Sequence, residues 1–484
     1  MLRLNLEEIR MIVGGRWVGG HRPAQSSHIP VDVAMTGVFV TGISNDSRTL
    51  VRGDLYVALH GERFDGHAFL KEAHTRGAVA ALLSREDVAV PPELPCVLVS
   101  DTLVAMGDIA RHYRASLPDT RIIAVAGSCG KTTTREMIAA VLSTVAPVHR
   151  NDKNHNNRVG VPQTIFGLET HHRFGVIEIG TSEPGEIAAL TAIVQPDQAV
   201  MTCIDQEHLE RLGSIEGVIV EEAELFRGMG EDGVAIINFD DANSLRARHS
   251  ARCRVVSYGF DRRCEVRGGD IDTTTEGTEF RLNDRHRFRL NIFGRHNVSN
   301  ALAAIAAGWV NGVPVEKMRD ALERFRPVDM RSDVEQFLGV TVIDDCYNAN
   351  PASMRAGLQT LSDMRGRQHR IACLGDMLEL GATAEEAHVV LGWYVATRQV
   401  DLLVAVGPLM RIAGRRVEEY GVEVRYFDDP EDAGRAIADL VEPRDAVLFK
   451  GSRGMHMDRA LKSFKEKVGG ADSRSGQCSR IDKH

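Results

Sequence analysis

Short apolar runs alternate with longer amphipathic segments along most of the chain, most clearly after residue 120. RIIAVA (121–126) has the pattern of a buried strand, and FGVIEIG, QAVMTCI and GVAIIN repeat it before residue 240. The segment after RIIAVA carries its apolar residues at helical spacing on one face, namely Met137, Ile138, Val141, Leu142 and Val145. Apolar strands separated by amphipathic helices are typical of a parallel sheet covered by helices.

A second alternating series begins near Arg331. Its expected strands are VTVIDD, RIACLGD, DLLVAVG and AVLFKGS, and its expected helices include 353–365 and 384–398. This order of elements predicts a separate Rossmann-like, doubly wound domain in the C-terminal part of the chain.

The first 118 residues follow a mixed pattern. VFVTGISNDSR predicts a strand that runs into a polar turn, LYVAL, GAVAALL and CVLVS predict further strands, and 103–116 predicts a helix. Pro118 interrupts that helix and marks a boundary. We therefore expect an α/β protein with a mixed α/β N-terminal domain (1–118), a central parallel-sheet domain (119–328), the C-terminal domain (329–468) and a disordered tail (469–484).

The composition indicates an ordinary globular protein and does not identify a function. Hydrophobic residues make up 43% of the chain and charged residues 26%, near the averages for globular proteins, and the net charge of −9 gives no reason to expect a nucleic-acid partner. No run approaches the ~18 apolar residues of a membrane span, and Glu7, Glu8 and Arg10 interrupt the stretch that is apolar in a signal peptide. The eight cysteines form no CxxC pair, so we expect reduced thiols in a cytoplasmic protein.

The strongest local signal is GSCGKTTT, Gly127 to Thr134, between the strand RIIAVA and an amphipathic helix. This context predicts a phosphate-binding loop and a central domain of the P-loop ATPase type. Glycines let backbone N–H groups approach phosphate oxygens, Lys131 supplies a charge, and the Thr132 hydroxyl suits Mg²⁺. The nucleotide-binding residues are expected to be Gly127, Ser128, Cys129, Gly130, Lys131, Thr132 and Thr133.

Two observations limit this interpretation. Val125 stands where the common Walker pattern has its first glycine, and the alternative is a chance turn before a helix. Cys129 occupies a variable loop position, and we assign it no redox role.

The shortened loop resembles that of the Mur ligase family and its folylpolyglutamate synthetase relatives. The segment 45–83 resembles the N-terminal domain of that family, and KNHNNRVGVPQT, EIGTSEPGEI and EHLERLGSIEGV resemble its central motifs. GRHNVSNALAA, IDDCYNANPASMRAGL, LGDMLELG and VLFKGSRGMHMDRAL follow in family order, to about residue 460. DDCYNANP and GDMLELG are the motifs that single out the branch of the family that adds D-alanyl-D-alanine.

The resemblance implies a three-domain, cytoplasmic ligase of peptidoglycan precursor synthesis that uses ATP and Mg²⁺. We expect a monomer, although the sequence does not reveal the oligomeric state. ATP would phosphorylate the terminal carboxylate of UDP-N-acetylmuramoyl-tripeptide, and the amine of D-alanyl-D-alanine would attack the acyl phosphate. A carboxylate needs such a leaving group because it is a poor electrophile. Two anions must meet, which explains the need for a metal and cations.

The resemblance also assigns roles to single residues. Lys131, Glu178 and His208 are the expected catalytic residues, and Thr132, Glu178 and His208 the expected metal ligands. Nucleotide contacts from outside the loop are expected from Asn297, Arg331 and Asp345. Five of these residues have a plainer alternative. Glu178 could be a solvated carboxylate at a strand end, and His208 an ordinary polar histidine. Asn297, Arg331 and Asp345 could be hinge or cap residues.

Substrate contacts are implied at further positions. Asp46, Ser47 and Arg48 match the stretch that binds the UDP-sugar end, and Asn156, Asn157, Thr181 and Ser182 match the path of the muramoyl peptide. Asn348 and Asn350 are candidates near the incoming dipeptide, with a polar turn as the alternative. Lys450 and Ser452 lie at another expected strand end and are weaker candidates.

The chain departs from the family at Glu222. Most Mur ligases carry a lysine about fourteen residues after the metal-site histidine, and its carbamate supplies a carboxylate near the metal; here that position is Glu222. Glu222 either supports the metal without CO₂, on a shorter arm, or belongs to a solvated helix face, since GSIEGVIVEEAELF is rich in acidic residues. Glu221 and Glu224 share a helical face from which Glu222 is rotated by about 100°, so not all three can point at a metal.

Two other functions remain open at this stage. One is a related ligase with a different amine acceptor, which the DSR…DGH segment and DDCYNANP disfavour. The other is a nucleotide-binding paralogue without catalysis, which only the glutamate at position 222 favours.

Overall fold

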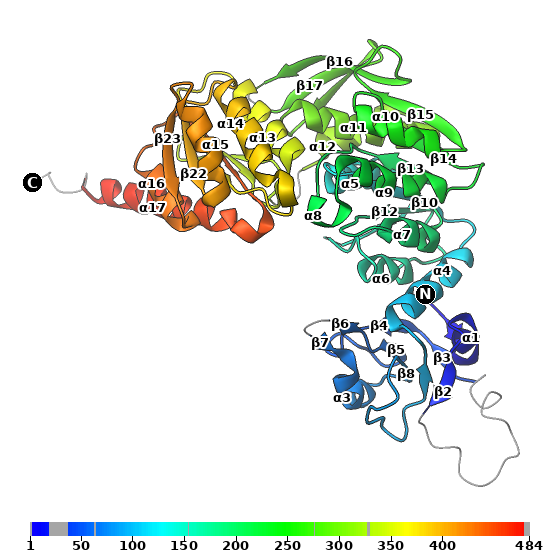
Figure 1. Cartoon of the computed structure of the whole chain (residues 1–484). Coiled ribbons are helices and arrows are strands. Elements are labelled where there is room, and N and C mark those ends of the chain that lie inside the picture. Colours follow the sequence, from blue (N-terminus) through cyan, green and yellow to red (C-terminus); the bar gives the residue numbers. More distant parts are fainter. Residues whose placement is uncertain are drawn as a thin grey trace, which may run out of the picture.

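The structure is a computed structural model that describes residues 2–18, 37–61, 64–152, 154–274, 276–326 and 330–478, with the backbone alone for 471–478. Figure 1 shows three bodies arranged as a bent chain, with the central one joined to the N-terminal one below and to the C-terminal one at its side. The predicted α/β class is confirmed, because each body is built on a sheet with parallel strands.

The N-terminal body has a five-stranded sheet in the order β2-β9-β8-β5-β4, parallel except for the β2–β9 pair. Its sheet strands are β2 (Arg16–Val18), β4 (Gly42–Ser44), β5 (Asp54–Val57), β8 (Ala80–Leu83) and β9 (Cys96–Leu98). Two small antiparallel pairs accompany it, β1 (Leu4–Asn5) with β3 (Phe39–Val40) and β6 (His60–Gly61) with β7 (Phe64–Asp65). Its helices are α1 (Leu6–Ile12), η1 (Gly66–Phe69), α3 (Leu70–Thr75) and α4 (Thr102–Ala115).

The central body has a nine-stranded sheet in the order β11-β12-β10-β13-β14-β15-β16-β17-β18. The strands from β11 to β16 are parallel, and β16 to β18 form an antiparallel meander. The strands are β10 (Arg121–Ala126), β11 (Val148–Arg150), β12 (Phe174–Glu178), β13 (Gln198–Met201), β14 (Val234–Asn238), β15 (Arg254–Gly259), β16 (Val266–Thr273), β17 (Thr278–Leu282) and β18 (His286–Leu290). The helices are α5 (Lys131–Leu142), α6 (Gly160–Phe166), α7 (Glu186–Val194), α8 (Leu209–Leu212), α9 (Ile215–Arg227), α10 (Ala242–Ala247), η2 (Arg248–Ser250), α11 (Arg295–Val310) and α12 (Val315–Arg324).

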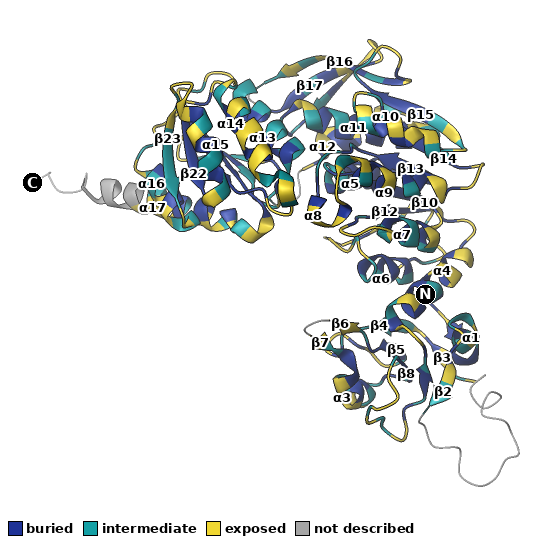
Figure 2. Cartoon of the chain, in the orientation of Figure 1, coloured by how far each residue is buried: buried dark blue, intermediate teal, exposed yellow. Residues whose placement is uncertain are grey.

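Both faces of the central sheet are buried, which explains the nearly continuous apolar strands. Along β10, Ile122 and Ala124 belong to one core, while Ile123 and Val125 belong to the core on the opposite face. Figure 2 shows these strands buried and the outer surfaces of the helices exposed. The carboxyl ends of the parallel strands are thereby held at one rigid edge, where ligands bind in such sheets.

The C-terminal body has a six-stranded sheet in the order β19-β20-β24-β21-β22-β23, parallel except for the β19–β20 pair. The strands are β19 (Asp333–Phe337), β20 (Val340–Asp345), β21 (Arg370–Gly375), β22 (Leu402–Val406), β23 (Glu423–Phe427) and β24 (Ala446–Lys450). The helices are α13 (Pro351–Asp363), η3 (Gly381–Thr383), α14 (Ala384–Ala396), α15 (Pro408–Glu418), α16 (Pro430–Ala438), η4 (Arg453–Met455) and α17 (Met457–Cys478).

The three expected domain boundaries, at residues 118, 328 and 469, have different outcomes. α4 ends just before the boundary at 118, but it packs on the central body, where the Tyr113 hydroxyl donates to the Leu168 carbonyl at 2.7 Å. The boundary at 328 falls within 327–329, outside the described residues. α17 continues through 469–478, where we expected a disordered tail, and residues 479–484 lie outside the described part. Among the described helices, none has the length and apolar content needed to cross a bilayer.

Candidate functional site

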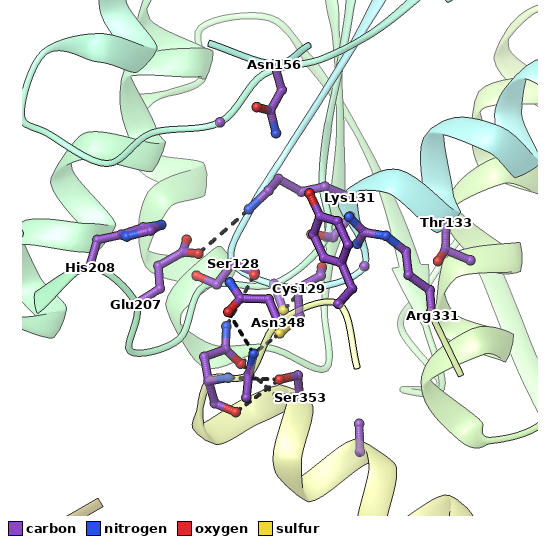
Figure 3. A pocket seen from close by; sticks show the side chains of 18 of the residues that line it. Ser128, Cys129, Lys131, Thr133, Asn156, Glu207, His208, Arg331, Asn348 and Ser353 are labelled. Atoms are coloured by element: carbon purple, nitrogen blue, oxygen red, sulfur yellow. Dashed lines mark hydrogen bonds and ion pairs between the residues drawn. The ribbon is translucent and has the colours of Figure 1, made fainter. Parts of the chain in front are cut away.

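A cavity of about 1170 Å³ lies where the central and C-terminal bodies meet. It is lined by the phosphate loop, by segments that follow β12 and β13, and by residues that follow β20 and β24. Figure 3 shows side chains from both bodies, including Lys131, Glu207, Arg331 and Asn348, gathered around it. Carboxyl ends of strands from two parallel sheets therefore face one shared space.

The phosphate loop is anchored between β10 and α5. Gly127 has φ of 118°, and a Cβ there would lie 2.4 Å from Thr202 Oγ1, so no residue with a side chain fits. The Ser128 N–H donates to the Cys203 carbonyl at 2.7 Å, which ties the loop to the end of β13. Gly130, with φ of 80°, precedes α5 without capping it by a side chain. The N–H groups of the first turn are therefore available to an anion.

Lys131 lies among carboxylates at the start of α5. Its ammonium group donates to the Gly127 carbonyl and lies 3.7 Å from Glu207 Oε2. Burial lowers the pKa of Lys131, but the carboxylates of Glu207, Glu222 and Glu178 outweigh burial and raise the pKa above its usual value. Lys131 therefore stays charged at neutral pH, as phosphate binding requires.

Glu178, at the end of β12, is buried and fully engaged. Its Oε2 accepts from Thr132 Oγ1 at 2.8 Å and from Arg135 at 3.2 Å, and its Oε1 accepts from Asn156 Nδ2 at 2.8 Å. Only 2% of Glu178 is exposed, so the alternative of a solvated strand-end carboxylate is wrong. The structure brings together Thr132 and Glu178, two of the expected metal ligands.

Glu222, on α9, points inward toward the phosphate loop. It is 0% exposed, and neither carboxylate oxygen has a hydrogen-bond partner of good geometry among the described residues. Burial and the Glu207 carboxylate raise the pKa of Glu222 to about 8, against the attraction of Lys131 and the nearby Gly127 N–H. The interpretation of Glu222 as part of a solvated helix face is therefore wrong.

The neighbouring glutamates on α9 have other surroundings. Glu221 is also buried, and it accepts from the backbone N–H groups of Gly185 and Ile187 at the start of α7, at 2.7 and 2.8 Å. Glu224 is half-exposed and pairs with Arg227. Only Glu222 of the three faces Lys131, consistent with the rotation expected from helical geometry.

His208 has a different environment from the one expected. It has φ of 48°, and its Nδ1 lies 2.5 Å from Glu379 Oε2 of the C-terminal body. Among the described residues, no group of three or more His, Cys, Asp or Glu side chains is arranged to ligate a metal. In this arrangement His208 therefore joins the two bodies.

The nucleotide contacts expected outside the loop line the same cavity. Asn297 is buried, donates to the Phe293 carbonyl at 2.8 Å just before its own helix, and lines the cavity. Arg331 stacks over the Tyr347 ring, 3.8 Å from its centroid. Asp345 accepts from Lys450 Nζ at 2.6 Å. Lys450 is thus buried and paired, while Arg331 remains directed at the cavity.

The expected substrate residues divide into two groups. The cavity is lined by Asn156, Asn157, Thr181, Ser182, Asn348, Asn350, Lys450 and Ser452. Asp46, Ser47 and Arg48 are not among its lining residues and lie in the N-terminal body. Arg48 binds Asp46 at 2.7 Å, and this hydrogen bond lowers the pKa of Asp46 to about 2.

Asn350 caps a helix of the C-terminal body and also contacts the phosphate loop. Its Oδ1 accepts from the Ser353 N–H at 2.9 Å and so caps α13, which begins at Pro351. The same oxygen accepts from Cys129 Sγ at 3.1 Å, and its Nδ2 donates to the Ser128 carbonyl at 3.3 Å. Asn350 therefore caps α13 and in addition joins the C-terminal body to the phosphate loop.

Sequence reasoning missed three residues of this site. Arg135 is buried one turn after Lys131 and pairs with Glu178, and its position on the inner side of α5 was a readable signal. Glu207 directly precedes His208 in the motif that led us to the histidine. Glu379 pairs with His208 across the two bodies, and no local pattern identifies such a partner.

Family models match three successive parts of the chain. They are described as the Mur ligase family catalytic domain at residues 39–114, the Mur ligase middle domain at 125–308, and the Mur ligase glutamate ligase domain at 330–453. The matched regions correspond to the three bodies of the structure.

Two relatives are UDP-N-acetylmuramoyl-tripeptide--D-alanyl-D-alanine ligases. The chain is 36% identical to that of Bacillus subtilis, over 88% of this chain and 93% of the relative. It is 33% identical to that of Escherichia coli, over 89% of this chain and 94% of the relative.

Solved structures of MurF enzymes are also similar to this chain over most of its length. MurF from Acinetobacter baumannii superposes with a TM-score of 0.85 at 30% identity, covering 96% of this chain and 99% of the other. MurF from Thermotoga maritima in complex with ADP has a TM-score of 0.79 at 27% identity, covering 89% and 98%. Three matching domains in family order, with identity above 30% over most of the chain, show that this protein belongs to the Mur ligase family.

Proposed function

We propose that this chain is an ATP-dependent ligase that joins D-alanyl-D-alanine to UDP-N-acetylmuramoyl-tripeptide through an acyl phosphate, in peptidoglycan precursor synthesis. The names of its relatives support this substrate pair. The observation that carries the proposal is the single cavity in which a phosphate loop and the strand ends of a second parallel sheet face one another.

The cavity has the charge distribution that phosphoryl transfer needs. Lys131 and the N–H groups at the start of α5 would hold the terminal phosphates of ATP. Arg331, held in place by the Tyr347 ring, would supply a second positive charge from the C-terminal body. The two cations belong to different bodies, so both can act on the same phosphates only where the central and C-terminal bodies meet.

The donor set fits Mg²⁺. Both carboxylate oxygens of Glu222 and Oε1 of Glu207 are buried and have no hydrogen-bond partner among the described residues. Hard oxygen donors suit Mg²⁺, which protein sites hold with one or two carboxylates while phosphates and water complete the shell. We assign Thr132 and Glu178, which are hydrogen-bonded to each other, to this site, and propose that Glu222 supports the ion in place of a lysine carbamate. When bound, the ion would neutralise charge on the phosphates.

The remaining chemistry concerns the substrates and the protein side chains. A carboxylate oxygen of the tripeptide attacks the γ-phosphorus, ADP leaves, and the amine of the dipeptide then attacks the acyl carbon as phosphate leaves. Asn156, Thr181 and Ser182, which line the cavity, would orient the carboxylate, and Asn348 would orient the dipeptide. Contacts between the bodies, such as Asn350 with the loop, would exclude water that hydrolyses an acyl phosphate.

The N-terminal body would hold the UDP-sugar end at Asp46, Ser47 and Arg48, which lie outside the cavity. We also propose that the protein works as a monomer in the cytoplasm. One chain supplies both the phosphate loop and the residues of the C-terminal body that line the cavity, so no second subunit is required to complete it. Light scattering of the purified protein tests the monomer.

The decisive experiment measures phosphate release with ATP and Mg²⁺. UDP-N-acetylmuramoyl-tripeptide, with diaminopimelate or lysine as the third residue, is supplied with D-alanyl-D-alanine, with D-alanine, or with no amine. We expect release to require the dipeptide and the product mass to equal the condensation of the two substrates. Lys131→Met should slow release by about 10²–10³-fold, whereas Lys317→Met, which replaces an exposed lysine on α12, is the matched control. ATP binding without dipeptide-dependent release would refute the proposal and favour a paralogue with another acceptor.

A further inference from the structure

Two free cysteines meet beneath the phosphate loop. Cys129 lies within the loop, and Cys203 follows β13, the strand next to β10. The Cys203 thiol donates to the Cys129 carbonyl at 3.7 Å, and the two thiols lie within hydrogen-bonding reach of each other. Both side chains are partly exposed and line the cavity, and Figure 3 shows Cys129 beside Ser128.

The backbone holds this pair together. The Ser128 N–H donates to the Cys203 carbonyl, and Gly127 passes so close that a Cβ there would lie 2.6 Å from that carbonyl oxygen. The two cysteines therefore approach each other in the folded protein through the same contacts that shape the loop. Disulfide formation needs such backbone proximity before any sulfur chemistry begins.

We propose that Cys129 and Cys203 are a modification site, a dithiol that a peroxide converts into a disulfide, and that this disulfide prevents the loop from binding nucleotide. In the first step one thiolate sulfur attacks a peroxide oxygen, the O–O bond breaks, and a sulfenic acid and water are formed. The second thiolate then attacks the sulfenic sulfur, the S–O bond breaks, and a second water leaves. Two thiols and one hydrogen peroxide thus give one disulfide and two waters. A small dithiol reverses the change by exchange.

The surroundings of the two sulfurs give them different roles. Hydrogen bonding to Cys203 lowers the pKa of the Cys129 thiol against burial, which raises it, and the charge of Lys131 also lowers it. The contact with Cys129, together with burial, raises the pKa of Cys203. Cys129 is therefore the thiol that reacts with the peroxide, and Cys203 is the one that closes the disulfide.

The other described cysteines lack this combination. Cys96 and Cys373 are fully buried, and burial raises the pKa of Cys96 to about 12. Cys253 is partly exposed, but burial raises the pKa of its thiol too, and it does not line the cavity. Cys253 therefore provides a matched control.

Closing the disulfide would change the part of the loop that contacts phosphate. The S–S bond is ~2.05 Å long, so the sulfurs must move from hydrogen-bonding separation to bonding distance and carry the loop backbone with them. Cys129 would also lose its hydrogen bond to Asn350 of the C-terminal body. The loss of one charge-assisted loop–phosphate hydrogen bond weakens nucleotide binding about tenfold, and the loss of two about a hundredfold.

The test uses the full-length protein treated with hydrogen peroxide, with and without saturating MgATP. We expect the intact mass to fall by ~2 Da as two thiol hydrogens are lost, a Cys129–Cys203 peptide in the non-reduced digest, and an ADP affinity at least about tenfold weaker. Dithiothreitol should restore the affinity, and MgATP should slow the reaction. The ADP affinity of Cys203→Ser and of Cys253→Ser is measured before and after peroxide treatment. Cys253→Ser should lose affinity that dithiothreitol restores, whereas Cys203→Ser should show no such reversible loss.

Two results would overturn the proposal. One is oxidation of other cysteines without a Cys129–Cys203 peptide, and the other is formation of that peptide with unchanged ADP affinity. Both readouts are independent of the ligase substrates, so failure of the proposed reaction would not be mistaken for failure of this site.

Discussion

Replacing Glu222 by glutamine is expected to stabilise the metal-free protein at pH 8 far more than at pH 5. Glu222 is 0% exposed, and burial and Glu207 raise its pKa from 4.5 to about 8. Between these two pH values the folded protein keeps the proton that the unfolded chain has released. The unfolded state then binds fewer protons, so stability falls as pH rises through this window.

The magnitude follows from the size of the shift. Each pH unit between 4.5 and 8 costs about 1.4 kcal/mol, so the raised pKa of Glu222 lowers the stability of the folded protein by about 4 kcal/mol at pH 8 and about 1 kcal/mol at pH 5. Glutamine has the shape of the protonated side chain and cannot ionise. Its buried amide brings a cost of its own that does not vary with pH, so the quantity to compare is the change between the two pH values, about 3 kcal/mol.

Thermal unfolding with a chelator present provides the measurement. For a unit of the size of the central body, about 3 kcal/mol corresponds to roughly 6–12 °C in Tm. The difference in Tm between Glu222→Gln and the parent protein should therefore be larger at pH 8 than at pH 5 by this amount. Glu224→Gln is the control on the same helix, because it removes a half-exposed carboxylate paired with Arg227.

Equal Tm differences at the two pH values would refute the reasoning, because they would mean that Glu222 titrates alike in the folded and unfolded protein. The same variant tests the role of the carboxylate. If Glu222 supports the metal, the gain in stability should be accompanied by a higher Mg²⁺ requirement for phosphate release, with added bicarbonate having no effect on the parent protein.

Three further substitutions test the site and its supports. Lys131→Met should lower kcat/KM for ATP by about 10²–10³-fold, measured by phosphate release, because it removes the cation in the loop. Arg135→Met should cost about 3–5 kcal/mol in urea unfolding, because it leaves the buried Glu178 without its paired cation; an unchanged midpoint would contradict the pairing. Asn350→Ala should cost about 1 kcal/mol as the cap of α13, and a Tm equal to that of the parent protein would exclude the cap.

Much of the fold was predictable because its signals are local. Strands such as β10 and β24 are continuous apolar runs, since helices cover both faces of their sheets. The start of α13 follows from Asn350 and Pro351, a cap and a first-turn proline. The meander from β16 to β18 was missed, because charged residues such as Arg281 and Arg287 alternate with its apolar ones and hide the strands.

The site was predictable to the extent that it depends on chain-adjacent residues. The loop from Gly127 to Thr133 forms where the motif predicts it, and Glu178 lies at the end of the expected strand. The environment of His208 was not predictable, since its partner Glu379 comes from the other body. The role of Cys129 was also hidden, because it depends on Cys203 across two neighbouring strands.

The sequence by itself determined the alternation of strands and helices, the phosphate loop and the family motifs, because each depends on residues within a turn or a strand of one another. Only the tertiary structure decided what surrounds the charges. Glu222, Glu207 and Lys131 come from separate segments that packing encloses together, and a carboxylate has a different pKa in that enclosure than on a helix surface. Burial and the pairing of distant charges arise only when the chain is folded, so a linear pattern of glutamates could not distinguish a solvated face from a buried site.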